Sequence, residues 1–188
     1  MALFNVHIDD KPKKTDDSAA IMRYIPKKNI CIGTPSDQLK KHIGLINQNE
    51  IVNFWSFGRW SMHDLLIHLL KQTGPADILV TTWSISEQAI RDILLKHKEG
   101  LIKSIQFILD PRIKVRNPKP LQLLAANFPY KMIACHAKVT IIENEQWKIS
   151  VVSSANMTNN PRFERGVIFP VQEIFEFDKT TFLHEFNS

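Results

Sequence analysis

A nearly continuous apolar run, ADILVTTWS at residues 76–84, places the strongest constraint on the fold of this chain. Such a run is typical of a strand that is buried on both faces. Helical patterns flank it on both sides: residues 62–74 follow a capping-box-like start at Ser61, and residues 87–100 follow a second cap at Ser86. Both helical segments have apolar faces that can cover the strand. The sequence therefore predicts a strand with helices packed against it.

Further strands and helices follow from the same patterns. We predict strands at 29–33, 50–58, 102–110, 130–144, 148–156 and 166–177, and helices at 36–48 and 118–129. A turn near residues 144–147 would join two of the strands, and a short tail would follow the last one. Strands alternate with helices through the middle of the chain, and consecutive strands pair at its end. This order predicts an α/β fold with a mixed β-sheet and helices on its faces.

Composition limits the classes of protein that need to be considered. The chain has 188 residues and a net charge of +5, a size that suits one domain and an excess that permits a phosphate-bearing partner without requiring one. No run approaches the roughly 20 apolar residues of a membrane helix, and the N-terminus lacks a secretory pattern. Cys31 and Cys135 are too few for a zinc framework. We expect a cytoplasmic protein with no membrane segment and no structural metal.

A histidine and a lysine interrupt the apolar pattern of residues 130–144. His136 and Lys138 are two positions apart, so in a strand they face the same side, and Ser154 and Asn156 repeat this spacing in the next predicted strand. Each residue alone is more often structural, as a core histidine or an edge lysine. Together they would supply an imidazole, a cation and neutral donors, which are the groups that cradle an oxyanion such as a phosphodiester.

These residues resemble a known family. HAKVTIIE followed by SSAN is similar to the phospholipase D superfamily pattern, His-x-Lys-x4-Asp followed by Gly-Ser-x-Asn. Glu143 stands in place of the aspartate, and Ser153 in place of the glycine. Glu164, in RFERG, resembles the downstream carboxylate that orients the histidine. The resemblance extends over about 50–178 and implies an N-terminal arm with peripheral elements at 1–45 and a catalytic domain at 46–188.

The resemblance implies a reaction without a cofactor. In this family one histidine attacks phosphorus to form a phosphohistidine, and a second histidine protonates the leaving oxygen. Here His136 would take these roles, Lys138 and Asn156 would bind the phosphate, and Ser154 would add a hydrogen bond. Glu143 and Ser153 would act as structural residues. This chain has one such motif, so the resemblance implies a homodimer that shares one active site, similar to dimeric phospholipase D-like endonucleases.

The loop DPRIKVRNPKP favours nucleic acid as the substrate. Arg112, Lys114 and Arg116 can neutralise successive phosphates, although a solvated basic loop is an equal alternative. We therefore expect a metal-independent endonuclease that cleaves DNA or RNA. A nucleic-acid-binding module without activity and a phospholipase or small phosphodiester hydrolase remain alternatives.

Two other features allow more than one interpretation. In FWSFGRW, the aromatic residues Trp55, Phe57 and Trp60 more often pack in a core or an interface than stack on bases. His63 and His68 are five apart on a predicted helix, so a zinc site there is improbable.

Overall fold

The structure is a computed structural model that describes residues 34–159 and 161–188. The strand expected at 29–33 lies outside the described residues. The elements, in chain order, are α1 (Pro35–His42), β1 (Val52–Trp55), α2 (Met62–Thr73), β2 (Ala76–Thr82), α3 (Glu87–Lys98), β3 (Ile102–Leu109), α4 (Ile113–Arg116), α5 (Pro118–Ala125), β4 (Tyr130–Met132), β5 (Val139–Glu143), β6 (Lys148–Ser153), β7 (Arg165–Phe169) and α6 (Gln172–Asn187).

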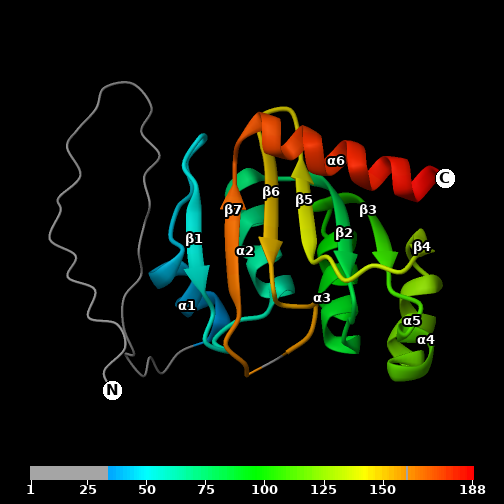
Figure 1. Ribbon diagram of the computed structural model, residues 1–188. Helices are drawn as coiled ribbons and strands as arrows, with labels where there is room; N and C mark the ends of the chain where they lie inside the picture. Colours follow the sequence, from blue (N-terminus) through cyan, green and yellow to red (C-terminus); the bar gives the residue numbers. More distant parts are fainter. Residues whose placement is uncertain (1–33, 160) are drawn as a thin grey trace, which may run out of the picture.

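The strands form one seven-stranded mixed sheet in the order β1-β7-β6-β5-β2-β3-β4. The neighbours β2, β3 and β4 are parallel, and the remaining pairs are antiparallel. Figure 1 shows α6 crossing one face of the sheet while α2 and α3 lie on the other. The predicted fold class, α/β with a mixed sheet and helices on its faces, is confirmed.

Two apolar layers hold the sheet. The larger one buries side chains of α2 and α3 against β2 and β3, including Leu69, Ile90 and Phe107, all fully buried. The smaller one packs Phe175 and Phe182 of α6 against Ile108 and Ile141 on the opposite face. Strand β2 contributes to both faces, which is why its sequence is apolar almost throughout.

The helix starts predicted beside β2 are correct. The Ser61 hydroxyl accepts a hydrogen bond from the Asp64 backbone N–H, and the Asp64 carboxylate accepts one from the Ser61 backbone N–H, which forms a complete capping box for α2. Ser86 caps α3 through the backbone N–H of Ala89. Helix α1 begins one residue earlier than the predicted 36–48 segment, with Thr34 as its cap, and it ends at His42.

The prediction of a single strand at 130–144 is wrong. The structure has two strands there, β4 and β5, with β2 and β3 between them in the sheet. Strand β4 pairs with β3 at the outer edge, whereas β5 pairs with β2 and β6. The chain must therefore cross the ends of β3 and β2, and residues 133–138, which we name the crossing segment, have no strand assignment.

The strand expected at 166–177 also needs correction. Strand β7 ends at Phe169, because Pro170 has no N–H to donate to a neighbouring strand. A 16-residue helix, α6, follows in place of the expected short tail. Its Phe175 and Phe182 are seven residues apart and so lie on one helical face, which covers the sheet.

The predicted boundary between 1–45 and 46–188 stays a prediction. Leu39 of α1 and Ile43, the residue after this helix, share the larger core with α2. Of the helices in the described part of the chain, none combines the length and the apolar character that crossing a membrane requires.

Candidate active site

Apart from Glu143, the predicted site residues belong to segments that meet at one edge of the sheet, the lower edge in Figure 1. Strands β2 and β6 end there while β5 and β7 begin there, because each of these neighbouring pairs is antiparallel. The crossing segment, the loop after β6 and the residue before β7 therefore meet, although they are separated along the chain.

His136 and Lys138 lie close together on the crossing segment. The Lys138 Nζ is 3.1 Å from His136 Nδ1 and 3.2 Å from Nε2, and it donates to the His136 backbone carbonyl at 2.6 Å. Cys135 and Ala137 line an apolar hollow beside α6 instead. The extended backbone thus separates polar from apolar side chains even without strand pairing.

The two members of this pair differ in burial. His136 is exposed, whereas Lys138 retains only 9% of its exposure. Burial lowers the pKa of Lys138 below the ordinary lysine value, while Cys135 and Glu164 act in the opposite direction. A buried cation behind an exposed imidazole is suited to a ligand that brings negative charge to the surface.

The loop after β6 holds Asn156 beside the end of β2. The Ser153 N–H donates to the Lys138 carbonyl at 3.0 Å, and the Ser153 hydroxyl donates to the Arg165 carbonyl at 3.1 Å. Asn156 Oδ1 accepts from the Trp83 N–H at 3.2 Å. Within the described residues no acceptor binds Asn156 Nδ2, so its two N–H groups can donate to an anion.

Ser154 and Glu164 form a second contact at the same edge. The Ser154 hydroxyl donates to Glu164 Oε2 and accepts from the Arg165 N–H at 3.0 Å. Glu164 also acts on Lys138 through its charge. The hydrogen bond expected between Glu164 and His136 stays a prediction; the Glu164 carboxylate accepts from Ser154.

Glu143, at the position of the family aspartate, lies at the opposite end of β5 from this site. It binds Lys148 of β6 at 2.5 Å and Lys179 of α6 at 2.7 Å. Burial acts to raise the pKa of Glu143, but the two lysines outweigh it and keep the pKa below the ordinary value. These contacts join α6 to the sheet and give Glu143 a structural position.

The three predicted substrate-binding cations are not equivalent. The guanidinium carbons of Arg112 and Arg116 lie 5.3 and 4.4 Å from the centre of the Trp83 ring. Lys114, between them in sequence, is exposed, and no contact joins it to the other site residues within the described chain. Arg112 also binds Asp110 through Nε at 2.6 Å and Nη2 at 2.8 Å.

Sequence reasoning did not assign the roles of Trp83 and Asp110. The Trp83 ring meets the His136 ring edge-to-face, with centres 5.8 Å apart. Asp110 is buried, and its hydrogen bonds from Arg112 hold its pKa well below the ordinary value, with a further bond from the Cys135 backbone. Trp83 directly follows β2 and Asp110 directly follows β3, both at the site edge. A polar or aromatic residue directly after a buried strand is the sequence signal that could have identified them.

The aromatic residues of FWSFGRW divide between core and surface. Trp60 is buried in the larger core, as the packing interpretation predicted. Trp55 is 46% exposed and lies with Phe57 and Phe163 in a small cluster, in which the rings of Phe57 and Phe163 are 4.4 Å apart. Phe57 has a positive φ of 51°, an uncommon backbone conformation for a bulky residue.

One other group of residues has the composition of a hydrolytic triad. Ser61 Oγ is 2.7 Å from His63 Nδ1, and His63 Nε2 is 3.5 Å from Asp92. The Ser61 hydroxyl donates its proton to Asp64 at 2.6 Å, so it can only accept from His63. This polarity is the reverse of an activated nucleophile, and the group serves as a helix cap.

The described residues contain no group of three or more His, Cys, Asp and Glu side chains that could hold a metal ion. His68 instead contacts the Gly44 carbonyl at 3.0 Å and Gln72 at 2.9 Å.

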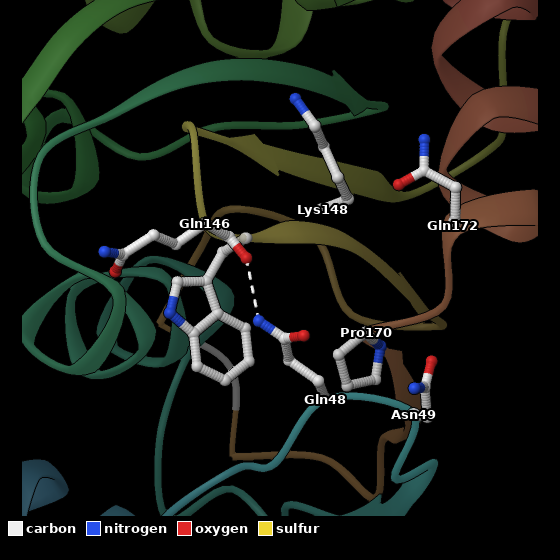
Figure 2. A pocket seen from close by; sticks show the side chains of 7 residues that line it. Gln48, Asn49, Gln146, Lys148, Pro170 and Gln172 are labelled. Carbon is white, nitrogen blue, oxygen red and sulfur yellow. Dashed lines mark hydrogen bonds between the residues drawn. The ribbon is translucent and has the colours of Figure 1, made fainter.

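A hollow of about 120 Å³ lies at the opposite edge of the sheet. Figure 2 shows its lining, in which Gln48 donates to the Gln146 carbonyl at 2.9 Å. The turn after β5 and Pro170 after β7 form part of this lining, and none of the predicted site residues reaches it.

The arrangement at the lower edge can bind and attack an anion. An exposed imidazole stands beside a buried ammonium on the crossing segment. An amide with unused donors and a hydroxyl lie on the loop after β6, which reaches the same edge of the sheet. The ammonium and amide donors can stabilise negative charge that develops on a ligand oxygen, and the imidazole can act as a nucleophile or an acid.

Comparisons with known proteins identify similar folds. No protein-family model matches the sequence, and a search of curated proteins gives no match. Among solved structures, NucT from Helicobacter pylori is similar, with a TM-score of 0.52 and 18% identity over 72% of this chain and 95% of its own.

Two longer proteins share the fold. The polyphosphate kinase from Porphyromonas gingivalis has a TM-score of 0.52 and 11% identity, over 78% of this chain and 28% of its own. TrmBL2, an archaeal chromatin protein with a novel mode of DNA binding, has a TM-score of 0.51 and 11% identity, over 80% of this chain and 59% of its own. The present chain spans less than two thirds of both proteins, and these likenesses concern the fold alone.

Proposed function

We propose that this chain is a metal-independent phosphodiesterase of the phospholipase D type, most suited to endonucleolytic cleavage of DNA or RNA in the cytoplasm. The observation that carries the proposal is the buried Lys138 beside the exposed His136, with Asn156 donors on the adjoining loop. Burying an ammonium costs free energy, so burial alone does not favour a purely structural lysine at this position. A phosphate oxygen bound beside Lys138 would offset that cost with its negative charge.

The proposed reaction has two displacements. An imidazole nitrogen of His136 attacks phosphorus, an N–P bond forms, and the P–O bond to the leaving group breaks. Water then attacks phosphorus and breaks the N–P bond, which regenerates the imidazole. Lys138 and Asn156 stabilise the non-bridging oxygens in both steps. The Ser154 hydroxyl donates its proton to Glu164 and so holds that carboxylate at the site, in place of the hydrogen bond to phosphate that the resemblance implies. Glu164 would orient His136 and fix its tautomer.

A second histidine is needed to protonate the leaving oxygen and then to deprotonate the water. The chain offers one motif, so we propose a symmetric homodimer in which His136 of the partner subunit takes this role. Two-fold dimers are the commonest assemblies and place equivalent residues face to face. Undiminished activity in a species shown to be monomeric by sedimentation would contradict this part of the proposal.

Nicking of supercoiled plasmid in excess EDTA tests the chemistry. The wild type should nick the plasmid, and His136→Ala should not. His184→Ala is the matched control, because His184 is 77% exposed on α6 and its described hydrogen bond is to Glu185, not to a residue of the site. Equal nicking by His136→Ala and wild type would refute the proposal.

A second candidate is a module that binds DNA without cutting it. The fold likeness to TrmBL2 and the replacement of the family aspartate and glycine by Glu143 and Ser153 favour it. Retardation of the plasmid on a gel without nicking would support this candidate. Neither nicking nor retardation would direct attention to phospholipids and small phosphodiesters.

A further inference from the structure

The basic loop after β3 presents two of its cations to one indole ring. Arg112 and Arg116 are four residues apart around the short helix α4, so they lie on the same side of it. Both guanidiniums lie over Trp83, at 5.3 and 4.4 Å from the ring centre. Lys114 is two residues from each, a spacing that directs it away from this ring.

The two arginines differ in whether a neighbouring carboxylate compensates their positive charge. Asp110 binds Arg112 through two nitrogens and compensates its charge. No carboxylate lies within ion-pair distance of Arg116 in the part of the chain that the structure describes. The indole face fixes the position of a guanidinium without neutralising it. Arg116 is therefore a held cation whose charge remains available.

Trp83 connects this cation to the phosphate site. The centre of its ring is 5.8 Å from that of His136, and its backbone N–H donates to Asn156 Oδ1 at 3.2 Å. The two ring distances together place the Arg116 guanidinium at most about 10 Å from the His136 ring centre. Neighbouring phosphates along an extended nucleic-acid strand can bridge that separation.

We infer that Trp83 and Arg116 form a second anion subsite, which binds the phosphate next to the one that His136 attacks. The inference rests on the proposed function and narrows its substrate class to a strand with consecutive phosphates. A glycerophospholipid with a single phosphodiester would leave Arg116 unused. Arg112 and Asp110 act as positioning residues that hold the loop against Trp83.

The salt dependence of nucleic-acid binding tests the subsite. Fluorescence anisotropy would give the Kd of a labelled single-stranded oligonucleotide at several salt concentrations, with all variants in a His136→Ala background to prevent cleavage. One phosphate contact contributes about 0.7 to the slope of log Kd against log salt for a single strand. Arg116→Gln should lower the slope by about this amount and raise Kd roughly fivefold.

Lys114→Gln is the matched control, since it removes the same charge from the same helix. It should leave the slope near that of the parent. Trp83→Leu should behave as Arg116→Gln does, provided that its circular dichroism spectrum and melting temperature show a folded protein. Equal slopes for Arg116→Gln and Lys114→Gln, or no binding by the parent, would overturn the subsite whatever Trp83→Leu does.

Hydrolysis of bis(p-nitrophenyl) phosphate separates this inference from the proposed function. The compound has one phosphodiester, so its cleavage by the otherwise unmodified protein requires the His136 chemistry and not the subsite. Arg116→Gln in that protein should leave this hydrolysis within about twofold. A large loss would overturn the subsite, because it would place Arg116 on the scissile phosphate. No hydrolysis by the wild type would count against the proposed chemistry, and the salt slopes would still decide the subsite.

Discussion

Replacing Lys138 by methionine should separate stability from activity. Methionine keeps the unbranched stem and a similar volume but removes the ammonium of a residue that is 9% exposed and whose pKa is lowered by burial. Burying an ion costs several kcal/mol, and the hydrogen bond to the His136 carbonyl at 2.6 Å returns about 1.5–3 kcal/mol. We expect the free energy of unfolding to be unchanged or higher by about 1–2 kcal/mol.

The same substitution should abolish most of the activity. Removing one group that stabilises a developing oxyanion typically costs about 10²–10³-fold in kcat. The assays are urea unfolding followed by circular dichroism and plasmid nicking in EDTA. Lys148→Met is a control, because Lys148 pairs with Glu143 at the opposite end of β5. It should lower stability slightly and leave nicking unchanged.

The opposite pattern would refute this reasoning. If Lys138→Met lost more than about 2 kcal/mol of stability and kept its nicking rate, the lysine would be a structural residue whose contacts outweigh its desolvation. The phosphate site would then lack its central cation, and the proposed chemistry would lose its main support.

Three further predictions concern stability. Burial lowers the pKa of His63, so below about pH 6.5 the unfolded state binds more protons than the folded state. The free energy of unfolding should therefore fall as pH falls through that value, and His63→Gln should flatten the dependence of the melting temperature on pH. Glu143→Ala should cost about 1–2 kcal/mol in urea unfolding by removing two half-buried ion pairs, with no loss of nicking; a loss of nicking at full stability would give Glu143 a chemical role. Gly58→Ala should cost at least about 2 kcal/mol, because Gly58 has a φ of 71° and an added Cβ would lie 2.6 Å from the Pro161 backbone; a neutral melting temperature would contradict the described contact between these loops.

Local signals predicted the centre of the fold well. Strand β2 was recognisable because one of its faces is fully buried and the other is partly covered, and Ser61 and Ser86 marked the helix starts through ordinary capping chemistry. The pairing of β5 with β6 followed from a turn at 144–147, where the Asn144 N–H donates to the Trp147 carbonyl at 3.0 Å. These features depend on contacts between residues that are near in sequence.

The errors arose where distant contacts decide the structure. Residues 130–144 have no internal break, and only the pairing of β4 with β3 at the outer edge divides them into two strands. In residues 166–177, apolar positions continue past β7, so the pattern looks like one long strand although Pro170 ends it. The helical spacing of Phe175 and Phe182 then decides the structure of α6.

The misread strand is also the part of the chain that builds the site. Because β4 and β5 are separated by two other strands, the crossing segment must pass over the ends of β2 and β3. Asp110, at the end of β3, accepts hydrogen bonds from both Arg112 and the Cys135 backbone. One buried carboxylate thus fixes the basic loop and the residue before His136 to the same strand end. A regular strand at 133–138 would have placed its backbone groups in a ladder and could not have made this contact, so the interruption that sequence patterns miss is what brings the cations and the imidazole together.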